Sequence, residues 1–141
     1  MKLIPFIIPL TAVLASASTV LVKYDTVYDS PNTSMDAVAC SDGKNGMETK
    51  GYPTFGSLPT FPNIGGAYTI AGYNSTSCGS CWKLTYNKTA TAYISAIDHA
   101  DNGFVISKQA LAALGGQQAV DGGQIYTSAT AVKGSYCGLQ S

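Results

Sequence analysis

Residues 78–82, CGSCW, decide how this chain folds, because two closely spaced cysteines stand directly before an expected strand. From Trp82 to Tyr86 the chain alternates apolar and polar residues, which is typical of a half-buried strand. A redox pair of the thioredoxin type would instead need its first cysteine at the start of a helix. A zinc site would need a second close pair of ligands, and the other cysteines and the single histidine are scattered. We therefore predict that these cysteines form structural disulfides.

The N-terminus has the pattern of a secretory signal peptide. Lys2 gives a positive start, residues 3–14 are almost entirely apolar and carry no charge, and residues 15–17 are small. The apolar run is shorter than the roughly 20 residues that a membrane span needs. Its two prolines disfavour the helix of the alternative, a retained N-terminal anchor. We expect cleavage after Ala17 or Ser18, so that residues 1–18 are removed and the rest is secreted into the extracellular space.

Residues 19–141 have the size of one domain, and no linker, repeat or charge run divides them. Without Lys2, 7 of the 8 lysines face 8 acidic residues and there is no arginine, which gives a net charge of −1. Such a surface has no electrostatic reason to bind nucleic acid or anionic lipid. Glu48 is the sole glutamate, so an acid/base pair for hydrolysis has few candidates. Composition therefore disfavours a nucleic-acid-binding protein and a hydrolase.

Most of the chain has the pattern of short strands. Five segments are rich in Tyr, Thr, Ile and Val and are bounded by turns that contain Gly or Asn: residues 20–28, 67–73, 82–86, 90–97 and 124–132. At least five strands in one small domain suggest a closed barrel. Four cysteines in a secreted domain predict two disulfides, each worth about 4 kcal/mol at most, and their spacing leaves three connectivities open.

Two short helices are expected between the strands. Ser107 can cap a helix over residues 108–114, which Gly115-Gly116 would end. Thr33 or Ser34 can start a second helix that carries Met35 and Val38 towards Cys40. Residues 46–66 contain three prolines and are expected to form a long ordered loop.

Six short motifs between Val20 and Leu139 are informative in combination. They are VKYDTVYD at 22–29, CSDG at 40–43, GYPTFG at 51–56, NIGG at 63–66, CGSCW at 78–82 and IDHADNGF at 97–104. In this order they resemble the cerato-platanin family of secreted fungal proteins, whose fold is similar to that of expansins and barrel-type inverting endoglucanases. The resemblance implies a mainly β fold, a six-stranded double-ψ β-barrel, with disulfides that join Cys40 to Cys78 and Cys81 to Cys137.

The resemblance also implies a function. It implies binding of chitin, N-acetylglucosamine oligomers or related β-glucans, and loosening of their packing without cleavage, so we expect no catalytic residue, cofactor or metal. Family members elicit plant defence and self-assemble at air/water interfaces. The resemblance therefore also implies a plant immune receptor as a partner, self-assembly at interfaces, and a location at the cell wall. Two other functions stay open. One is a surface-active coat; the other is a glycosidase in which Asp98 would pair with Asp25, Asp42 or Asp121.

Asp98 matches the carboxylate of the family's Ile-Asp motif, and its position supports a binding role independently. It follows the alternating segment 93–97, so it should emerge at the barrel rim, where a carboxylate can accept from two sugar hydroxyls. The other expected carbohydrate-binding residues are Asn102, Asp42, His99, Tyr24 and Gly43. The alternative is that Asp98, Asp101 and Asn102 only build the turn before Gly103.

Aromatic residues matter because a pyranose ring packs its apolar face on them. Trp82 is expected in the barrel core, and one of Tyr24 and Tyr28 in the core with the other at the rim. Tyr52 and Phe55, on the proline-rich loop, are expected to be exposed and to favour interfacial association. Three sequons make their asparagines candidates for N-glycosylation: Asn32, Asn74 and Asn87.

Overall fold

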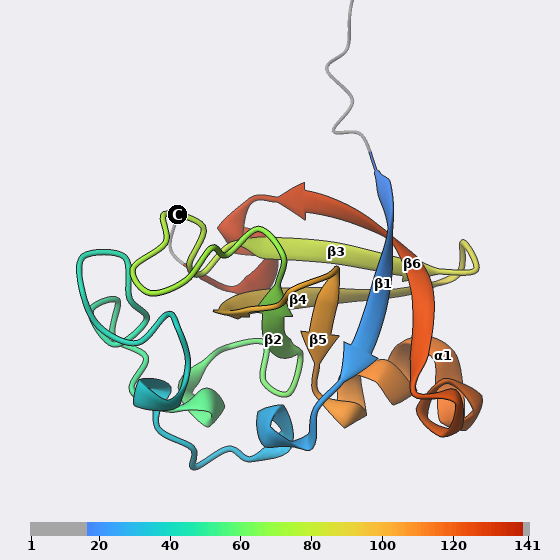
Figure 1. Ribbon diagram of the computed structural model, residues 1–141, viewed down its shortest axis with the longest axis horizontal. Coiled ribbons are helices and arrows are strands. Elements are labelled where there is room, and N and C mark those ends of the chain that lie inside the picture. The colour runs from blue at the N-terminus through green and yellow to red at the C-terminus, as the bar shows by residue number, and fades with distance from the viewer. Residues whose placement is uncertain (1–16, 140–141) are drawn as a thin grey trace, which may run out of the picture.

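Six strands close into a barrel in the computed structural model of the chain, which describes residues 17–139 (Figure 1). The strands are β1 (Ser18–Tyr24), β2 (Ile64–Ala67), β3 (Cys81–Tyr86), β4 (Ala90–His99), β5 (Phe104–Ile106) and β6 (Gln124–Val132). Around the barrel their order is β1-β5-β2-β4-β3-β6, and the β1–β5 and β2–β4 pairs are parallel. The predicted signal peptide lies outside the described residues apart from its last two positions, and Ser18 already belongs to β1.

The strands form where side chains alternate between the barrel interior and the outside. In β6 the inward residues are Ile125, Thr127 and Ala129, and they are buried, whereas Tyr126 between them is exposed. The strands carry large side chains without solvent contact: Val22, Leu84, Ile94, Ile97, Phe104 and Ile106. This buried set gives the closed sheet its hydrophobic core.

Residues 17–139 contain one α-helix, α1 (Lys108–Gly122), where two short helices were predicted. The Ser107 hydroxyl caps α1 as expected, accepting from the Ala110 amide at 3.0 Å. The helical backbone is interrupted at Gly116, as predicted, where φ is 72° and ψ is −171°, and a second helical stretch then continues to Gly122 with Ala119 and Val120 buried. The second predicted helix is a 3₁₀ turn over Met35–Ala37, started by Ser34.

Two strand predictions need correction. The predicted first strand, 20–28, ends at Tyr24, and Asp25 then begins a 3₁₀ turn over Thr26–Asp29. Of the predicted strand 67–73 only Ala67 is in a strand, because β2 lies earlier, inside the segment expected to be a loop. β2 can pack between β4 and β5 because its glycines lack side chains: a Cβ on Gly65 would overlap the Val105 carbonyl oxygen.

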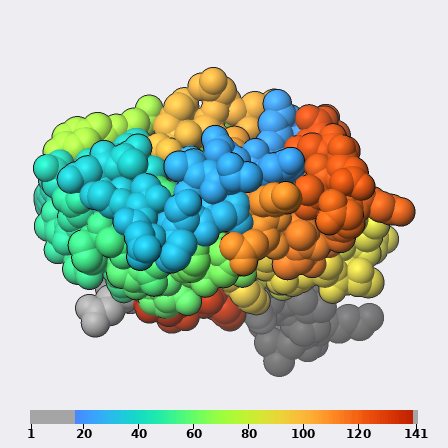
Figure 2. All heavy atoms as spheres, turned by 90° about the horizontal axis from the view of Figure 1, so that it is seen from below, coloured from blue at the N-terminus to red at the C-terminus, as the bar shows by residue number. Residues whose placement is uncertain are grey.

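The long segment between β1 and β2 folds against the barrel. Seen from below, this blue-to-green segment and the orange helix α1 share one face of the molecule (Figure 2). Phe55 was predicted to be exposed, but it is fully buried, with its ring 6.0 Å from that of Tyr28. Met35, Met47 and Leu58 are buried in the same segment, so it has apolar contacts that keep Phe55 from solvent. Trp82 is only half-buried, against Phe104.

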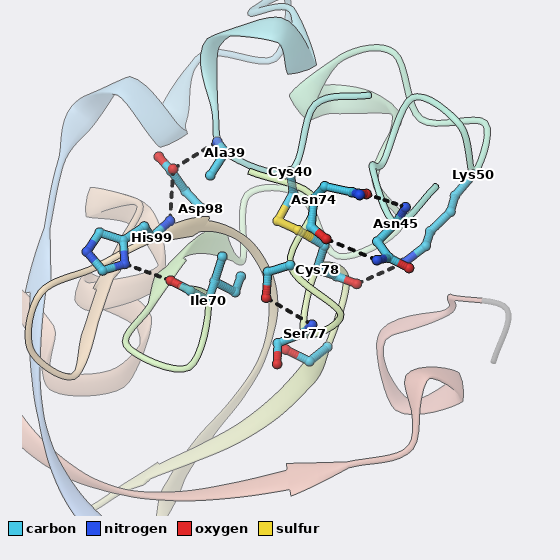
Figure 3. Close-up of a disulfide and its surroundings, with 12 residues drawn as sticks. Ala39, Cys40, Asn45, Lys50, Ile70, Asn74, Ser77, Cys78, Asp98 and His99 are labelled. Carbon is cyan, nitrogen blue, oxygen red and sulfur yellow. Dashed lines mark hydrogen bonds between the residues drawn. A yellow bond between two sulfur atoms is a disulfide. The ribbon is translucent and has the colours of Figure 1, made fainter. Parts of the chain in front are cut away.

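Both disulfides have the pairing that the resemblance implied. Cys40 bonds to Cys78, and Cys81 bonds to Cys137, so each cysteine of the CGSCW motif has a distant partner. The first disulfide ties the loop after Ala39 to the loop before β3 (Figure 3). Next to this disulfide, the Lys50 amine donates to the Cys78 carbonyl at 2.8 Å, and its partial burial lowers its pKa. The Cys40–Cys78 disulfide therefore supports the loops on which the candidate site is built.

Candidate functional site

Asp98 is held at the end of β4 by donors from two other segments and from the next residue of its own strand. Its Oδ2 accepts from the Tyr28 hydroxyl at 2.7 Å. Its Oδ1 accepts from the backbone amides of Ala39 at 3.0 Å and His99 at 2.9 Å (Figure 3). A carboxylate offers about four acceptor positions, so about one remains for a ligand. The prediction that Asp98 emerges at the rim matches its half-buried side chain, but most of its bonding capacity holds the protein together.

Tyr28 is the permanent donor of this arrangement. Burial raises the pKa of the Tyr28 hydroxyl far above its usual value, and the charge of Asp98 and the hydrogen bond to it raise it further. Because the pKa of the Tyr28 hydroxyl lies above that of an ordinary tyrosine, the phenol keeps its proton at neutral pH and donates it to Asp98. Of the two tyrosines expected to divide between core and rim, Tyr28 is the buried one and Tyr24 is half-buried. Tyr28 contacts Asp98, whereas the sequence predicted Tyr24 as the binding tyrosine.

The His99 ring contacts two turns, one after β2 that contains Ile70 and one after β4 that contains Asp101. Its Nδ1 lies 2.6 Å from the Ile70 carbonyl oxygen, and its Nε2 lies 2.9 Å from Asp101 Oδ1. Both neighbours are acceptors, and only the protonated imidazole donates from both nitrogens. The Ile70 hydrogen bond raises the pKa of His99 above its usual 6.5, as do Asp101 and, more weakly, the charge of Asp98. We call Asp98, Tyr28, Ala39, His99 and Asp101 the Asp98 cluster.

The raised pKa of His99 gives a pH dependence with a defined sign. Stability from its two hydrogen bonds is fully present below the unfolded value of 6.5 and is lost as pH rises through the higher folded value. We expect an NMR titration of the His99 ring to give a pKa above 6.5, and Asp101→Asn to lower it. Asp121→Asn is the control. Asp121 lies on α1 and bonds to Gln117, so this change should leave the His99 titration as it is. A pKa at or below 6.5 in the unaltered protein would contradict this arrangement.

A second polar cluster lies beyond the Cys40–Cys78 disulfide. Asp42 Oδ1 accepts from the Tyr73 hydroxyl, which raises the pKa of Tyr73. Asn74 Oδ1 accepts from the Asn45 amide at 2.9 Å, and Asn45 Nδ2 donates to the Asn74 carbonyl at 3.0 Å (Figure 3). Gly43 has a positive φ of 79° and packs so closely that a Cβ would lie 2.9 Å from Asn74 Oδ1. We call Asp42, Gly43, Asn45, Tyr73 and Asn74 the Tyr73 cluster.

The structure distributes the six predicted carbohydrate-binding residues over several places. Asp98 and His99 lie together, and Asp42 and Gly43 belong to the Tyr73 cluster. Asn102 lines a separate hollow of about 340 Å³, with Tyr68 and Tyr126. Sequence reasoning missed Tyr73, a residue that is 64% exposed and whose hydroxyl donates to Asp42. The only signal for it was an aromatic residue shortly before the CGSCW motif.

The three sequons differ in their surroundings. Asn87 lies exposed in the turn between β3 and β4, and Asn32 lies exposed in the turn after Pro31. Asn74 is half-buried, and its side-chain oxygen is already bonded to Asn45. Between residues 17 and 139, no three His, Cys, Asp or Glu side chains come together as metal ligands. In the same stretch, no helix has the length and apolar character needed to cross a membrane.

Known proteins share both the sequence pattern and the fold. A family model described as cerato-platanin matches residues 20–139. The heat-stable 19 kDa antigen of Coccidioides immitis is 44% identical over 133 residues, which cover 94% of this chain and 90% of the antigen.

Solved structures agree with this match. Cerato-platanin 3 from M. perniciosa is 46% identical with a TM-score of 0.82, and the match covers 86% of this chain and 100% of that one. The fungal elicitor Cerato-Platanin, solved in solution, is 36% identical with a TM-score of 0.75, over 84% of this chain and 96% of that one. The barrel of this protein is therefore the double-ψ barrel of these structures. The chain belongs to the cerato-platanin family.

Proposed function

We propose that this protein is secreted and binds N-acetylglucosamine oligomers or related β-glycans, without cleaving them, across the Asp98 and Tyr73 clusters. The observation that carries the proposal is the pairing of a charged acceptor with a fixed aromatic ring on the two sides of one disulfide. Asp98 keeps about one free acceptor position, and His99 beside it supplies an exposed ring. Tyr73 presents most of its ring to solvent, and its bond to Asp42 restricts the ring's motion.

Secretion is supported by the two disulfides, which form and persist in oxidising compartments. The apolar N-terminal segment is consistent with a signal peptide, and we propose residues 1–18 for it. A wall-associated location and recognition by a plant immune receptor are extensions of the same proposal. The likeness to a solved structure described as a fungal elicitor supports the proposed recognition, and a wall-associated location follows from the proposed glycan binding.

Hydrolysis is not part of the proposal, because the geometry of Asp98 differs from that of a general acid. An inverting glycosidase needs one carboxyl group that gives a proton and a second that activates water. All three groups bonded to Asp98 donate to it, so it acts as an acceptor. Asp121, one of its expected partners, lies on α1 and bonds to Gln117, and Asp25 bonds to the Val27 amide. Both carboxylates thus have local structural partners.

The alternative of a surface-active coat loses one of its supports. It was expected from exposure of Tyr52 and Phe55, but Phe55 is fully buried and Tyr52 is half-buried. The large exposed apolar or aromatic side chains among residues 17–139 are Val27, Tyr68, Tyr73, Tyr126 and Tyr136. Tyrosines at these positions suit sugar contacts at least as well as an air/water interface.

Titration with N-acetylglucosamine tetramer tests the proposed site, and the choice of variant matters. Asp98→Ala would leave the Ala39 and His99 amides without their acceptor, so lost binding could reflect a changed loop. Asp98→Asn keeps an oxygen for these amides but removes the charge. Without the charge, hydrogen bonds from sugar hydroxyls are about half as strong. We expect Asp98→Asn and Tyr73→Ala each to weaken binding about three- to tenfold, as a loss of about 1 kcal/mol implies.

NMR chemical shifts of the secreted, oxidised protein measure this binding and show where it occurs. Asp121→Asn is the matched control, because it removes one negative charge on α1, away from both clusters. The proposal requires shifts on the Asp98 and Tyr73 clusters with unchanged affinity in the control. Affinities that are equal in all four proteins, or no shifts with chitin or cellulose oligomers, would contradict it.

A further inference from the structure

The outer face of β1, β6 and β3 carries a row of hydroxyl groups. Thr85 of β3 pairs with Ser128 of β6, and Ser128 pairs with Thr19 of β1. On the other side of β3, Thr85 pairs with Thr91 of β4, and their hydroxyl oxygens are 3.2 Å apart. The four hydroxyls therefore cross four neighbouring strands at the strand spacing of about 4.8 Å. Such a row offers donors and acceptors at regular intervals.

Two hollows on this side of the barrel meet at the same tyrosine. One has a volume of about 440 Å³ and is lined by residues of β1, β3 and β6 and of the turn after β3. The other, of about 340 Å³, extends from the start of β1 to Tyr68 and Asn102. Thr19 and Tyr126 line both. Tyr126 is 62% exposed and lines both hollows, so a ligand in either of them can contact it.

The larger hollow is positively charged. Lys83 and Lys88 line it, and none of the residues that line it is acidic. Within the part of the chain that the structure describes, neither lysine lies within salt-bridge distance of a carboxylate. The Asp98 and Tyr73 clusters have the opposite character, because they contain Asp98, Asp101 and Asp42. The two regions therefore differ in the charge of the ligand that they can attract.

We propose that this face, which we call the lysine face (Thr19, Lys83, Thr85, Lys88, Tyr126, Ser128 and Thr130), binds an acidic polysaccharide built of uronate sugars. The uronate carboxylates pair with Lys83 and Lys88, the sugar hydroxyls bond to the row of Thr and Ser side chains, and a pyranose ring packs on Tyr126. Two lysines without an arginine suit the separated carboxylates of a sugar chain better than the dense phosphates of a nucleic acid. This second site is independent of the function proposed above.

The probe is tetragalacturonate, added to the secreted, oxidised and unglycosylated protein while NMR shifts are recorded. Unglycosylated protein is needed because Asn87, in a sequon, also lines the larger hollow. We expect shifts on the lysine face and weaker binding as salt is raised, since the Debye length is about 8 Å at physiological ionic strength. Lys83→Gln with Lys88→Gln should weaken binding about three- to tenfold, as two exposed ion pairs allow. Tyr126→Ala should weaken it without changing the salt dependence.

Two controls decide between a built site and general attraction. Lys44→Gln with Lys108→Gln changes the net charge equally at exposed positions outside this face and should leave uronate binding unchanged. The methyl ester of the same tetramer should bind at least about threefold more weakly than the acid. Equal weakening by both double variants, equal binding of the ester, or no shifts on this face would overturn the proposal. The Lys83/Lys88 variant should bind N-acetylglucosamine tetramer normally, so failure of either site is seen separately.

Discussion

Replacing Cys81 and Cys137 with alanine is expected to lower the free energy of unfolding by about 4 kcal/mol. The two cysteines are 56 residues apart, so their bond removes much of the conformational freedom of the unfolded chain. It also ties the C-terminal 3₁₀ turn, Gly134–Cys137, to the start of β3, and both cysteines are almost fully buried. Unfolding in guanidinium chloride, followed by tyrosine and tryptophan fluorescence, measures the loss. A loss below about 1 kcal/mol would contradict the chain-entropy account.

The other disulfide provides the comparison. Cys40 and Cys78 are 38 residues apart, and because the entropy depends on the logarithm of loop length, their removal should also cost about 4 kcal/mol. The two double variants should differ in what they do to the candidate site. Loss of the Cys40–Cys78 bond separates the Asp98 cluster from the Tyr73 cluster and should weaken binding of N-acetylglucosamine tetramer. The Cys81/Cys137 variant should bind the tetramer normally, as long as the measurement is made at a temperature at which the variant is folded.

Gly103→Ala is expected to destabilise the protein by about 3 kcal/mol, from two sources of comparable size. Gly103 has a φ of +60°, which an alanine adopts only with strain. A Cβ there would also overlap the backbone carbonyl of Leu21 in β1, which cannot move without disturbing the barrel. The Gly103 carbonyl accepts from the Tyr68 amide at 2.8 Å, so the strain reaches the loop that follows β2. Thermal or denaturant unfolding measures the loss.

Gly72→Ala is the matched control for this prediction. A Cβ on Gly72 would meet no heavy atom within 4 Å, and its φ is outside the positive range. The substitution reduces the freedom of the unfolded chain and should change stability by less than about 1 kcal/mol, towards a more stable protein. If the two glycine variants were equally stable, neither the close contact nor the positive φ of Gly103 would matter to the fold.

The strands that sequence predicted well are those with a side-chain pattern of their own. β3, β4 and β6 are six or more residues long and rich in β-branched and aromatic residues, and each was predicted to within two residues at either end. β2 was missed because its core is Gly65-Gly66, where no side chains alternate and the strand exists through close backbone contact. β5 has three residues, which is too short for periodicity to be visible. The continuation of α1 past Gly116 depends on burial of Ala119 against the barrel, a tertiary effect.

The candidate site was predictable in part for the same reason. The position of Asp98 at a strand end follows from the alternation before it, and the structure places it at the end of β4. Its partner Tyr28 could not be chosen over Tyr24, because the 3₁₀ turn that begins at Thr26 changes the direction of the chain between them. The Ala39 amide is a backbone group and leaves no trace in the sequence. Burial of Phe55 likewise depends on how a long loop packs.

The order of strands around the barrel has a consequence for how the protein is made. β1 pairs with β5 and β6, so the first strand to be synthesised finds its hydrogen-bonding partners only after residues 104–132 have appeared. Pairings so distant in sequence slow folding, because the chain must close long loops before it gains contacts. Among residues 17–139, β3 and β4 are the only consecutive strands that a tight turn joins into a hairpin. Within the part of the chain the structure describes, this hairpin can therefore form during synthesis, whereas closure of the barrel waits for the last strand.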